Sequence, residues 1–356
     1  MIVWDNSRMS IELLECTLRD GSYEIDFQFT SKFTGEFCEK LENLGFPYIE
    51  IGHGMGVDAS EKIRKAAATD YEYARAAESA TKNAKWGMFA IPGIAEKSTI
   101  KNLAEEGMKF VRVGIDALEM RQGIEFIDEV SQLGLEVYVN FMKSYALPPQ
   151  EFISRVEQVI DLGVNGVYLV DSAGGMLPSE IREIGSRLQK YSSVTKLGFH
   201  GHDNLGLALS NSVDLTGYGF RLLDSTMQGI GRSSGNASTE KLISILDRMG
   251  LVKEYDVIEI LKSGEELIRP KIPYAGHSGL DTMAGYVMFH TSYMDNLLEV
   301  CSQKGLDPYI LMQEHCKENR ISGSRQEFNS LAERLKFEGN VGKYVPPARK
   351  YIGNEQ

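Results

Sequence analysis

The sequence predicts a closed (β/α)8 barrel, or TIM barrel, followed by a C-terminal helical extension. Short β-type runs alternate with longer segments of helical period through residue 250, and eight such runs can be counted. This alternation is typical of parallel strands joined by crossover helices. No G-x-G-x-x-G follows the first run, as it would in an open sheet that binds a dinucleotide. The count of eight therefore favours a closed barrel.

The eight predicted strands are short runs of mostly apolar residues. We place them at 13–18, 48–52, 86–91, 110–115, 137–141, 166–170, 197–200 and 222–227. Helical segments lie between them, as in SKFTGEFCEKLENLG, where apolar residues recur at spacings of three or four. Beyond residue 250 the strand pattern stops and amphipathic helices dominate. We predict a barrel over 1–250, a helical region over 251–340 and a basic tail over 341–356.

The composition is that of a soluble globular protein, with 42% hydrophobic and 25% charged residues among 356. The formal net charge of -12 would repel a phosphate backbone, so we expect no nucleic-acid partner. No apolar stretch reaches the about 18 residues that indicate a membrane span. The N-terminal MIVWDNSRMS also lacks the pattern of a signal peptide. We therefore expect a cytoplasmic protein that does not bind a membrane.

The four cysteines show neither a C-x-x-C pair nor the density of a disulfide scaffold. We expect all of them to be reduced and structural. Cys16 has a second interpretation, because it lies beside charged residues at the end of the first predicted strand and could touch the site.

Two histidines in the seventh predicted strand give the sharpest chemical signal. His200 and His202 lie two apart, so both imidazoles can face one point at the barrel mouth. Alone they could equally be polar side chains that line a pocket. Asp20 ends the first strand, which the closed barrel brings near the seventh. Two imidazoles and one carboxylate, with open positions, suit Mn, Co, Fe or Mg better than a closed structural zinc site.

Open positions on such an ion fit a 2-oxo acid, which chelates through its carboxylate and keto oxygens. The ion can then stabilise the enolate that forms when a neighbouring carbon loses a proton or a carbon-carbon bond. Arg19 supplies a positive charge that can also hold the enolate oxygen. The alternative is a salt bridge at the barrel rim, since adjacent strand residues point to opposite sides unless the turn at Gly21 re-aims one.

Two weaker signals lie near these residues. Asp203 could orient a metal ligand from behind, or it could be a solvated carboxylate. The glycine-rich segment QGIGRSSGNAST follows the eighth strand. It could cradle a phosphate or carboxylate through its backbone N–H groups, or it could be a plain tight connection.

Five motifs, CTLRDGSY, IEIGHGMG, VDSAGG, GFHGHDNLGLALSNS and GIGRSSGNAS, follow one another within residues 12–240. In this order they resemble the pyruvate-carboxyltransferase-like metalloenzymes, also called DRE-TIM metallolyases. Within that superfamily, which includes 3-hydroxy-3-methylglutaryl-CoA lyase and isopropylmalate and homocitrate synthases, the likeness is greatest to the 4-hydroxy-2-oxovalerate aldolases. It extends through PGIAEKSTIKNL and weakly into GYVMFHTSYM.

The resemblance implies a role for each matching residue. Asp20, His200 and His202 would bind a divalent metal ion (Mn, Co or Mg), with Asn236 as a ligand or close neighbour. Arg19 would stabilise the enolate, and Ser172 would contact the substrate carboxylate. The implied activity is that of an aldolase or lyase, which forms or cleaves a carbon-carbon bond of a 4-hydroxy-2-oxo acid through a metal-stabilised pyruvate enolate.

Two positions depart from the aldolase pattern. Tyr23 stands where the aldolase has the histidine that handles the C4 hydroxyl proton, and His290 stands where it has a tyrosine. Our hypothesis is that Tyr23 and His290 together move this proton, with His290 the better base. Alternatively, His290 packs on a helix and Tyr23 shapes the pocket. The cysteine that marks 3-hydroxy-3-methylglutaryl-CoA lyases after the eighth strand is absent.

Other functions remain open. A Claisen-type acyltransferase would condense acetyl-CoA with a 2-oxo acid. The chain could also be chiefly a partner subunit, because the aldolases it resembles pair with an acylating aldehyde dehydrogenase. An apolar stripe in the helical extension could form such a surface, although such a stripe is more often core: Met283, Met288, Phe289 and Met294. We also expect a homo-oligomer.

Overall fold

The computed structural model describes most of the chain. The described residues are 10–232, 234–272, 279–280, 283, 287, 289, 293–319 and 323–346. Two residues named above, Met288 and His290, lie outside them, as does 347–356 of the predicted tail.

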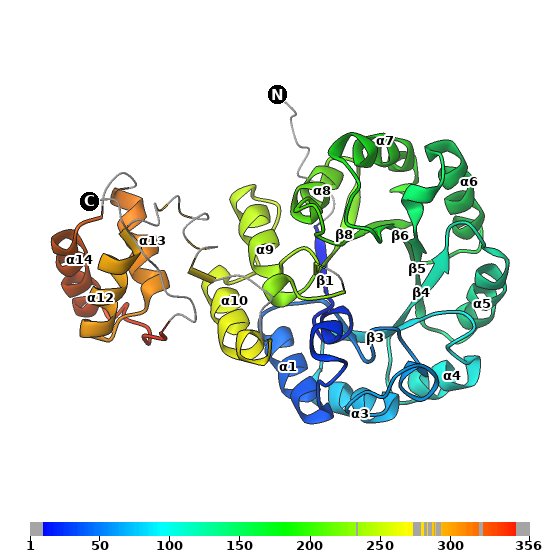
Figure 1. Ribbon diagram of the computed structural model, residues 1–356, viewed down its shortest axis with the longest axis horizontal. Helices are drawn as coiled ribbons and strands as arrows, with labels where there is room; N and C mark the ends of the chain where they lie inside the picture. The colour runs from blue at the N-terminus through cyan, green and yellow to red at the C-terminus, as the bar shows by residue number, and fades with distance from the viewer. Residues whose placement is uncertain are drawn as a thin grey trace.

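Eight parallel strands close into a barrel, each paired with the next in chain order and the last paired with the first. Figure 1 looks into this ring of strands and its outer layer of helices. The strands are β1 (Glu12–Glu15), β2 (Tyr48–Ile51), β3 (Lys85–Ala90), β4 (Phe110–Asp116), β5 (Glu136–Met142), β6 (Gly166–Asp171), β7 (Lys196–Gly201) and β8 (Phe220–Ser225). The predicted TIM barrel and all eight of its strands are confirmed.

Helices connect the strands and cover the outside of the barrel (Figure 1). Their apolar faces pack on the strands, and several begin with a side-chain cap, as where Thr69 and Glu72 form a capping box. The helices are α1 (Ser31–Asn43), α2 (Ala59–Lys62), α3 (Asp70–Ala80), α4 (Lys97–Glu105), α5 (Arg121–Ser131), α6 (Pro149–Ile160), α7 (Pro178–Leu188), α8 (Ala208–Thr216) and α9 (Thr239–Arg248).

The first strand ends earlier than its apolar pattern predicts, at Glu15 instead of residue 18. The carbonyl of Cys16 accepts hydrogen bonds from the backbone N–H groups of Arg19, Asp20 and Gly21, so the chain turns at once. A 3-10 helix, η1, follows over Asp20–Ile25. Because of this turn, the neighbouring side chains of Arg19 and Asp20 both reach the barrel mouth instead of pointing to opposite sides.

The barrel interior has an apolar layer with a charged layer towards the carboxyl ends of the strands. The apolar layer is mainly aromatic and aliphatic: Leu14, Cys16, Tyr48, Phe110, Tyr138, Tyr168, Val170 and Leu222. The charged layer contains Arg112, whose guanidinium lies 4.2 Å from the centre of the Tyr168 ring. Arg112 is fully buried there together with Glu50.

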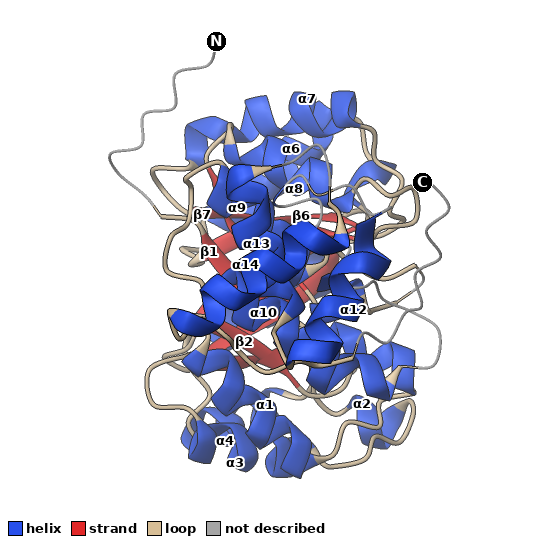
Figure 2. Ribbon diagram, turned by 90° about the vertical axis from the view of Figure 1, so that its left-hand side faces the viewer, coloured by secondary structure: helices blue, strands red, loops and turns tan. Residues whose placement is uncertain are grey.

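The chain beyond the barrel is helical, as predicted. It consists of α10 (Val257–Ser263), a π-helical turn (Gly264–Ile268), a 3-10 turn (Arg269–Lys271), α12 (Met294–Lys304), α13 (Pro308–Glu318) and α14 (Arg325–Phe337). The last three pack on one another at one side of the barrel, next to α10 (Figures 1 and 2). Lys262 of α10 forms an ion pair with Asp307, which caps α13.

The apolar stripe that could have formed a partner surface is core where it is described. Met283, Phe289 and Met294 are all buried. All four cysteines are free and buried. The helices in the described part of the chain are too short or too polar to cross a lipid bilayer.

Candidate active site

A cavity of about 240 Å3 opens at the carboxyl ends of the barrel strands. The closed barrel predicts this place for chemistry, because the loops after the strands converge there. Six of the residues singled out from the sequence line it: Arg19, Asp20, Tyr23, Ser172, His200 and His202. The barrel thus brings residues that lie up to 183 positions apart in the sequence to one cavity.

The predicted triad of Asp20, His200 and His202 converges at the floor of this cavity. One ligand atom from each lies within 4.8 Å of the others, and all three residues are buried. His200 Nε2 is 3.1 Å from Asp20 Oδ2, and the two imidazole rings are perpendicular, with centroids 5.1 Å apart. Three oxygen and nitrogen donors around one point are the set that a catalytic divalent cation uses while keeping positions for substrate.

The protonation states of two members of the triad fit metal binding. Burial acts to raise the pKa of Asp20, but the nearby Arg19 and the two histidines hold it well below its usual range. Burial lowers the pKa of His202 to about 4. Its Nδ1 lies 3.2 Å from the carbonyl of Gly235, so Nδ1–H donates there and Nε2 keeps its lone pair. Asp20 is thus ionised and His202 neutral at neutral pH, as ligands must be.

Asn236 lies beside the triad, on the loop after β8, where it forms an antiparallel bridge with His202. Its Nδ2 donates to the carbonyl of Ile230 at 3.1 Å. Its Oδ1 is buried and makes no hydrogen bond within the described part of the chain. A buried amide oxygen without a partner is costly unless a cation or water binds it. The residues present therefore fit a divalent metal ion.

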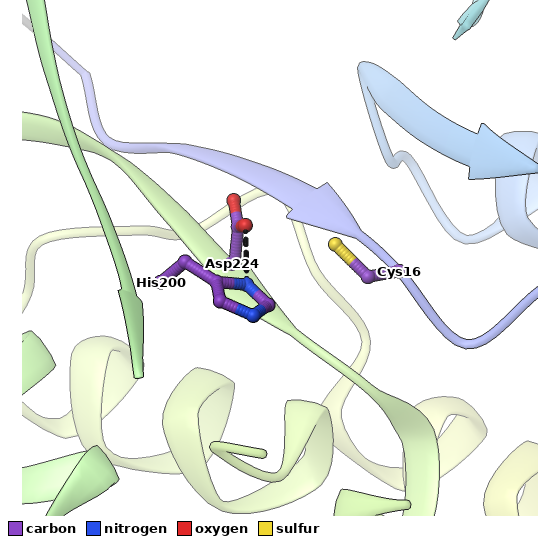
Figure 3. A group of neighbouring side chains, drawn as sticks. All are labelled: Cys16, His200 and Asp224. Carbon is purple, nitrogen blue, oxygen red and sulfur yellow. Dashed lines mark hydrogen bonds and ion pairs between the residues drawn. The ribbon is translucent and has the colours of Figure 1, made fainter. Parts of the chain in front are cut away.

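His200 is held from behind by a carboxylate that the sequence analysis missed. Its Nδ1 lies 2.8 Å from Oδ2 of Asp224, at the end of β8 (Figure 3). Arg112, in the middle of β4, donates to the same oxygen of Asp224 and to Oε2 of Glu50 at 3.0 Å. A carboxylate on the far nitrogen fixes the ring orientation and leaves Nε2 to face the cavity.

Cys16 completes a second cluster of possible ligands with His200 and Asp224, and its thiol points towards them in Figure 3. Burial, together with the negative charges of Asp224 and Glu50, raises the pKa of Cys16 well above its usual value. A thiol that stays protonated is a poor metal ligand and a poor nucleophile. The cavity-facing triad is therefore the better metal site, and Cys16 lies beneath it.

Asp224→Asn is expected to weaken binding of Mn2+ by about ten- to a hundredfold, because the histidine loses the charged partner that orients it. Isothermal titration calorimetry of the purified protein with Mn2+ measures this. Asp214→Asn, at an exposed pair with Arg182 on the outer helices, is the matched control and should keep the affinity of the wild type. Equal affinities for the two variants would show that Asp224 does not orient the ligand.

Arg19 is fixed by two carboxylates. Its Nε donates to Glu50 at 2.7 Å and its Nη1 to Asp20 at 2.9 Å. The guanidinium also lies 4.7 Å from the centre of the Phe89 ring. Its Nη2 donates to none of the described residues, so this nitrogen remains for a ligand in the cavity that Arg19 lines. Arg19 is thus a buried, rigidly placed cation next to the triad and more than a rim salt bridge.

Ser172 and Tyr23 both line the cavity. The Ser172 hydroxyl accepts a hydrogen bond from the backbone N–H of Lys143 at 3.0 Å, which leaves its own proton for a ligand. The Tyr23 ring packs edge-on against Phe27, and its hydroxyl forms no hydrogen bond with a described residue. Burial and the charge of Asp20 raise the pKa of Tyr23. His290, its proposed partner, lies outside the described residues.

The glycine-rich loop after β8 folds onto the triad and is pinned by buried carboxylates. The backbone N–H of Arg232 donates to Asp20 Oδ1 at 3.1 Å. The carboxylate of Glu15 accepts a hydrogen bond from the backbone N–H of Met227 at 3.0 Å, and that of Glu240 accepts one from the backbone N–H of Gln228. The described residues of the loop are thus held in place by hydrogen bonds and form one wall of the site. The loop positions Arg232 and Asn236 and is more than a plain connection.

The buried Glu15 gives a prediction about stability and pH. Burial raises its pKa to about 7, against the ordinary 4.5 of an unfolded chain. Between these values the folded protein binds more protons, so this carboxyl lowers the free energy of unfolding as pH rises. The free energy of unfolding of the wild type, minus that of Glu15→Gln, should fall by about 2 kcal/mol from pH 5 to pH 8. Denaturant unfolding at both pH values measures it, and a pH-independent difference would contradict the shift.

Other polar residues at the strand ends have structural roles. Asp203 accepts the backbone N–H of Ala208 at 3.0 Å and so shapes the start of α8, which favours the simpler interpretation of that residue over a role behind the metal ligands. His53 stacks on Phe27 and bonds to the backbone at Met55 and Arg64. Asp171 accepts backbone N–H groups from Gly175 and Met176.

Glu50, Arg112 and Asp224 are the site residues that the sequence analysis missed. Each is a charged residue inside an apolar strand, in YIEI, FVRVGID and FRLLDS. A charge in the middle of a buried strand is rarely tolerated without a partner. That signal alone could have identified them as members of a buried network.

Known proteins match this chain over most of its length. A profile of the HMGL-like family matches residues 10–267. An oxaloacetate decarboxylase of Mycobacterium tuberculosis is 32% identical over 306 residues, which cover 86% of this chain and 90% of that protein. A 4-hydroxy-2-oxovalerate aldolase of Geobacillus stearothermophilus is 28% identical, with 91% of this chain and 95% of that protein covered.

Solved structures share the barrel. The N-terminal domain of an aldolase-like protein from Bacteroides vulgatus has a TM-score of 0.62 at 24% identity, covering 73% of this chain and 86% of that chain. Hydroxymethylglutaryl-CoA lyase from Pseudomonas aeruginosa has a TM-score of 0.65 at 16% identity, with 79% and 99% covered. At these identities the likeness supports the fold alone.

Proposed function

The chain belongs to the HMGL-like family, and from this premise we propose that it is a divalent-cation-dependent carbon-carbon lyase acting on 2-oxo acids. The specific reaction we propose is the cleavage or formation of a 4-hydroxy-2-oxo acid from pyruvate and an aldehyde. The observation that carries the proposal is the convergence of Asp20, His200 and His202 with the fixed guanidinium of Arg19 at one cavity.

The residues that would hold the cation are Asp20, His200 and His202, with Asn236 beside them. When bound there, Mn, Co or Mg supplies a Lewis acid that draws electron density from the oxygens of a 2-oxo acid. Ser172 donates a hydrogen bond from its hydroxyl to the substrate carboxylate. Arg19 places Nη2 against the keto oxygen, where negative charge grows as the carbon-carbon bond breaks, and the fixed charge lowers that barrier without having to reorganise.

Proton transfer at the C4 hydroxyl needs a donor and an acceptor. Tyr23 stays protonated at neutral pH because its pKa is raised, so it serves better as the donor towards an aldehyde oxygen. In the cleavage direction the same path runs in reverse: the C4 hydroxyl passes its proton to Tyr23 as Tyr23 passes its own proton to His290, which we assign as the base. In this arrangement the two residues together move the proton that a single histidine moves in the aldolases.

Tyr23→Phe and His290→Ala should each lower the rate of cleavage at least about a hundredfold, since each removes one end of the proton path. Stopped-flow measurement of pyruvate release reports the rate. The exchange of pyruvate C3 protons in D2O, which does not involve the C4 hydroxyl, should be retained in both variants. Wild-type cleavage by either variant would remove that residue from the mechanism.

A second candidate is decarboxylation of oxaloacetate, the activity named for the relative that is 32% identical. This reaction passes through the same enolate and releases carbon dioxide, so no hydroxyl proton has to be removed. Tyr23 in place of the aldolase histidine favours it, because a protonated phenol is a poor base.

One assay separates these activities. Pyruvate release is measured over a panel of 4-hydroxy-2-oxo acids and oxaloacetate with Mn, Co or Mg, and Asp20→Ala serves as the blank. The proposal predicts cation-dependent pyruvate release from at least one member of the panel. Thiol release from acetyl-CoA with a 2-oxo acid, and no pyruvate release, would instead identify the Claisen-type acyltransferase.

The location, the assembly and the partner of the protein are also proposals, the location from the sequence pattern and the partner from the resemblance. We propose that the protein is cytoplasmic and forms a homo-oligomer. We also propose that it passes the aldehyde to an acylating aldehyde dehydrogenase. Activity of the protein purified alone, followed by gel filtration, distinguishes an autonomous enzyme from an obligate partner subunit.

A further inference from the structure

Three cationic side chains line the cavity, and two of them are neutralised by the protein. Arg19 is paired with Glu50 and Asp20. Lys143 donates to Asp116 at 2.6 Å. Arg232 forms no ion pair with any residue that the structure describes, although it also lines the cavity. Among the described lining residues the only carboxylate is Asp20, which is already engaged.

The position of Arg232 is set from both ends. Its backbone N–H donates to Asp20 Oδ1 at 3.1 Å, so the backbone of Arg232 lies next to the triad. Its Nη2 donates to the backbone carbonyl of Ser172 at 2.8 Å, across the mouth from the loop after β8 to the loop after β6. One face of the guanidinium is thereby anchored, and Nε and Nη1 remain for another acceptor.

The free donors of Arg232 and the hydroxyl of Ser172 are brought together by this anchor. The Ser172 hydroxyl already accepts from the backbone N–H of Lys143, so its proton points elsewhere. A planar guanidinium with two free N–H groups beside a hydroxyl donor is the arrangement that binds a carboxylate. A lysine at this place could offer only a point charge.

We propose that Arg232 is a specificity-determining residue that binds a carboxylate of the substrate at the mouth of the cavity. The inference rests on the proposed function and names the recognition element of the same site. Asp20, the only carboxylate among the described lining residues, is already engaged by Arg19, so the positive charge of Arg232 is left to meet a negative charge of the substrate. That charge comes either from the carboxylate of the 2-oxo acid itself or from a second carboxylate on the departing carbon.

The test compares Arg232→Gln with the wild type on two substrates. Pyruvate, followed by exchange of its C3 protons in D2O, has one carboxylate. Oxaloacetate, followed by decarboxylation, has two. Arg121→Gln, at an exposed pair with Glu125 on α5, is the matched control. Loss of a charge-assisted hydrogen bond should raise KM by about ten- to a hundredfold with little change in kcat. Arg232→Lys should recover only part of the loss.

The pattern of KM identifies the carboxylate. A rise for both substrates assigns Arg232 to the carboxylate of the 2-oxo acid, and a rise for oxaloacetate alone assigns it to the second carboxylate. If KM is unchanged for both, or changes as much in Arg121→Gln, the inference is overturned. A fall in kcat without a change in KM would also overturn it, since that pattern indicates a structural role.

A binding measurement separates this inference from the proposed function. Oxalate carries carboxylates and needs no chemistry to bind, so calorimetric titration of the Mn2+-loaded protein tests Arg232 directly. We expect about tenfold weaker binding to Arg232→Gln than to the wild type. Should the wild type catalyse neither reaction, the proposed function fails while this titration still decides the role of Arg232. Equal affinities of the two proteins for oxalate and, in a second titration, for the longer dicarboxylate malonate would refute that role.

Discussion

Asp20→Asn is expected to lower the rate of pyruvate release at least about a thousandfold, because the proposed cation site loses the one carboxylate that its described residues supply. Asp20 Oδ2 lies 3.1 Å from His200 Nε2, and its pKa is held well below the usual range, so it is a permanent negative charge at the point of convergence. The asparagine has the same shape but no charge. Calorimetry with Mn2+ should show a matching loss of cation affinity.

The Asp20→Asn experiment needs a folding check, since the side chain also accepts the backbone N–H of Arg232. Circular dichroism and thermal unfolding should resemble those of the wild type, because asparagine can keep that hydrogen bond. Asp214→Asn, on the outside of the barrel, should keep full activity. Wild-type rates in Asp20→Asn, with the fold intact, would eliminate the cation site as the basis of activity.

Arg19→Lys is expected to lower kcat by about a hundred- to a thousandfold while leaving the affinity for Mn2+ close to that of the wild type. The charge is kept, so the carboxylate of Asp20 is still balanced. The geometry is lost, because a single ammonium cannot bond to Glu50 and Asp20 as Nε and Nη1 do and also point a third donor at the keto oxygen.

The readout for Arg19→Lys is the split between two measurements. Pyruvate release and exchange of pyruvate C3 protons should both fall, since both pass through the enolate, whereas the calorimetric affinity for Mn2+ should persist. Arg121→Lys, at an exposed pair on α5, is the matched control. Parallel loss of Mn2+ binding and turnover would mean that Arg19 only supports the cation site.

The barrel and the triad could be predicted because local patterns encode them. Alternating apolar runs locate the strands, and the spacing of His200 and His202 by two places both rings on one side of β7. The closed order of the strands then brings Asp20 close to His200. The family predicted from the motifs is confirmed by the profile match over residues 10–267.

Local patterns could mark the members of the supporting network as charges in buried strands, but they could not predict which of them pair. Arg112 contacts Asp224, which is 112 positions away, and Glu50, which is 62 positions away. No periodicity links residues on three strands whose partners depend on the radius and tilt of the barrel. The turn after β1 could not be predicted either. It is formed by three backbone N–H groups that donate to the carbonyl of Cys16, and such bonds do not depend on residue type. That turn allows Arg19 and Asp20 to work side by side.

Chemistry at the C4 hydroxyl stays a prediction, as do the bound cation and the substrate. Tyr23 lines the cavity, as the resemblance implies. His290 lies outside the described residues, so the pairing of the two rests on the motif comparison and on the variants proposed above. The roles assigned to Asn236 and Ser172 are likewise proposals, supported by an unpartnered amide oxygen and an available hydroxyl proton.

The most direct test of the cation site is anomalous diffraction from crystals grown with Mn2+ and oxalate. The account predicts one strong peak within about 2.0–2.3 Å of Asp20 Oδ, His200 Nε2 and His202 Nε2, with oxalate oxygens in the remaining positions. A peak elsewhere in the barrel, or no peak at these three side chains in Mn2+-saturated crystals, would contradict it.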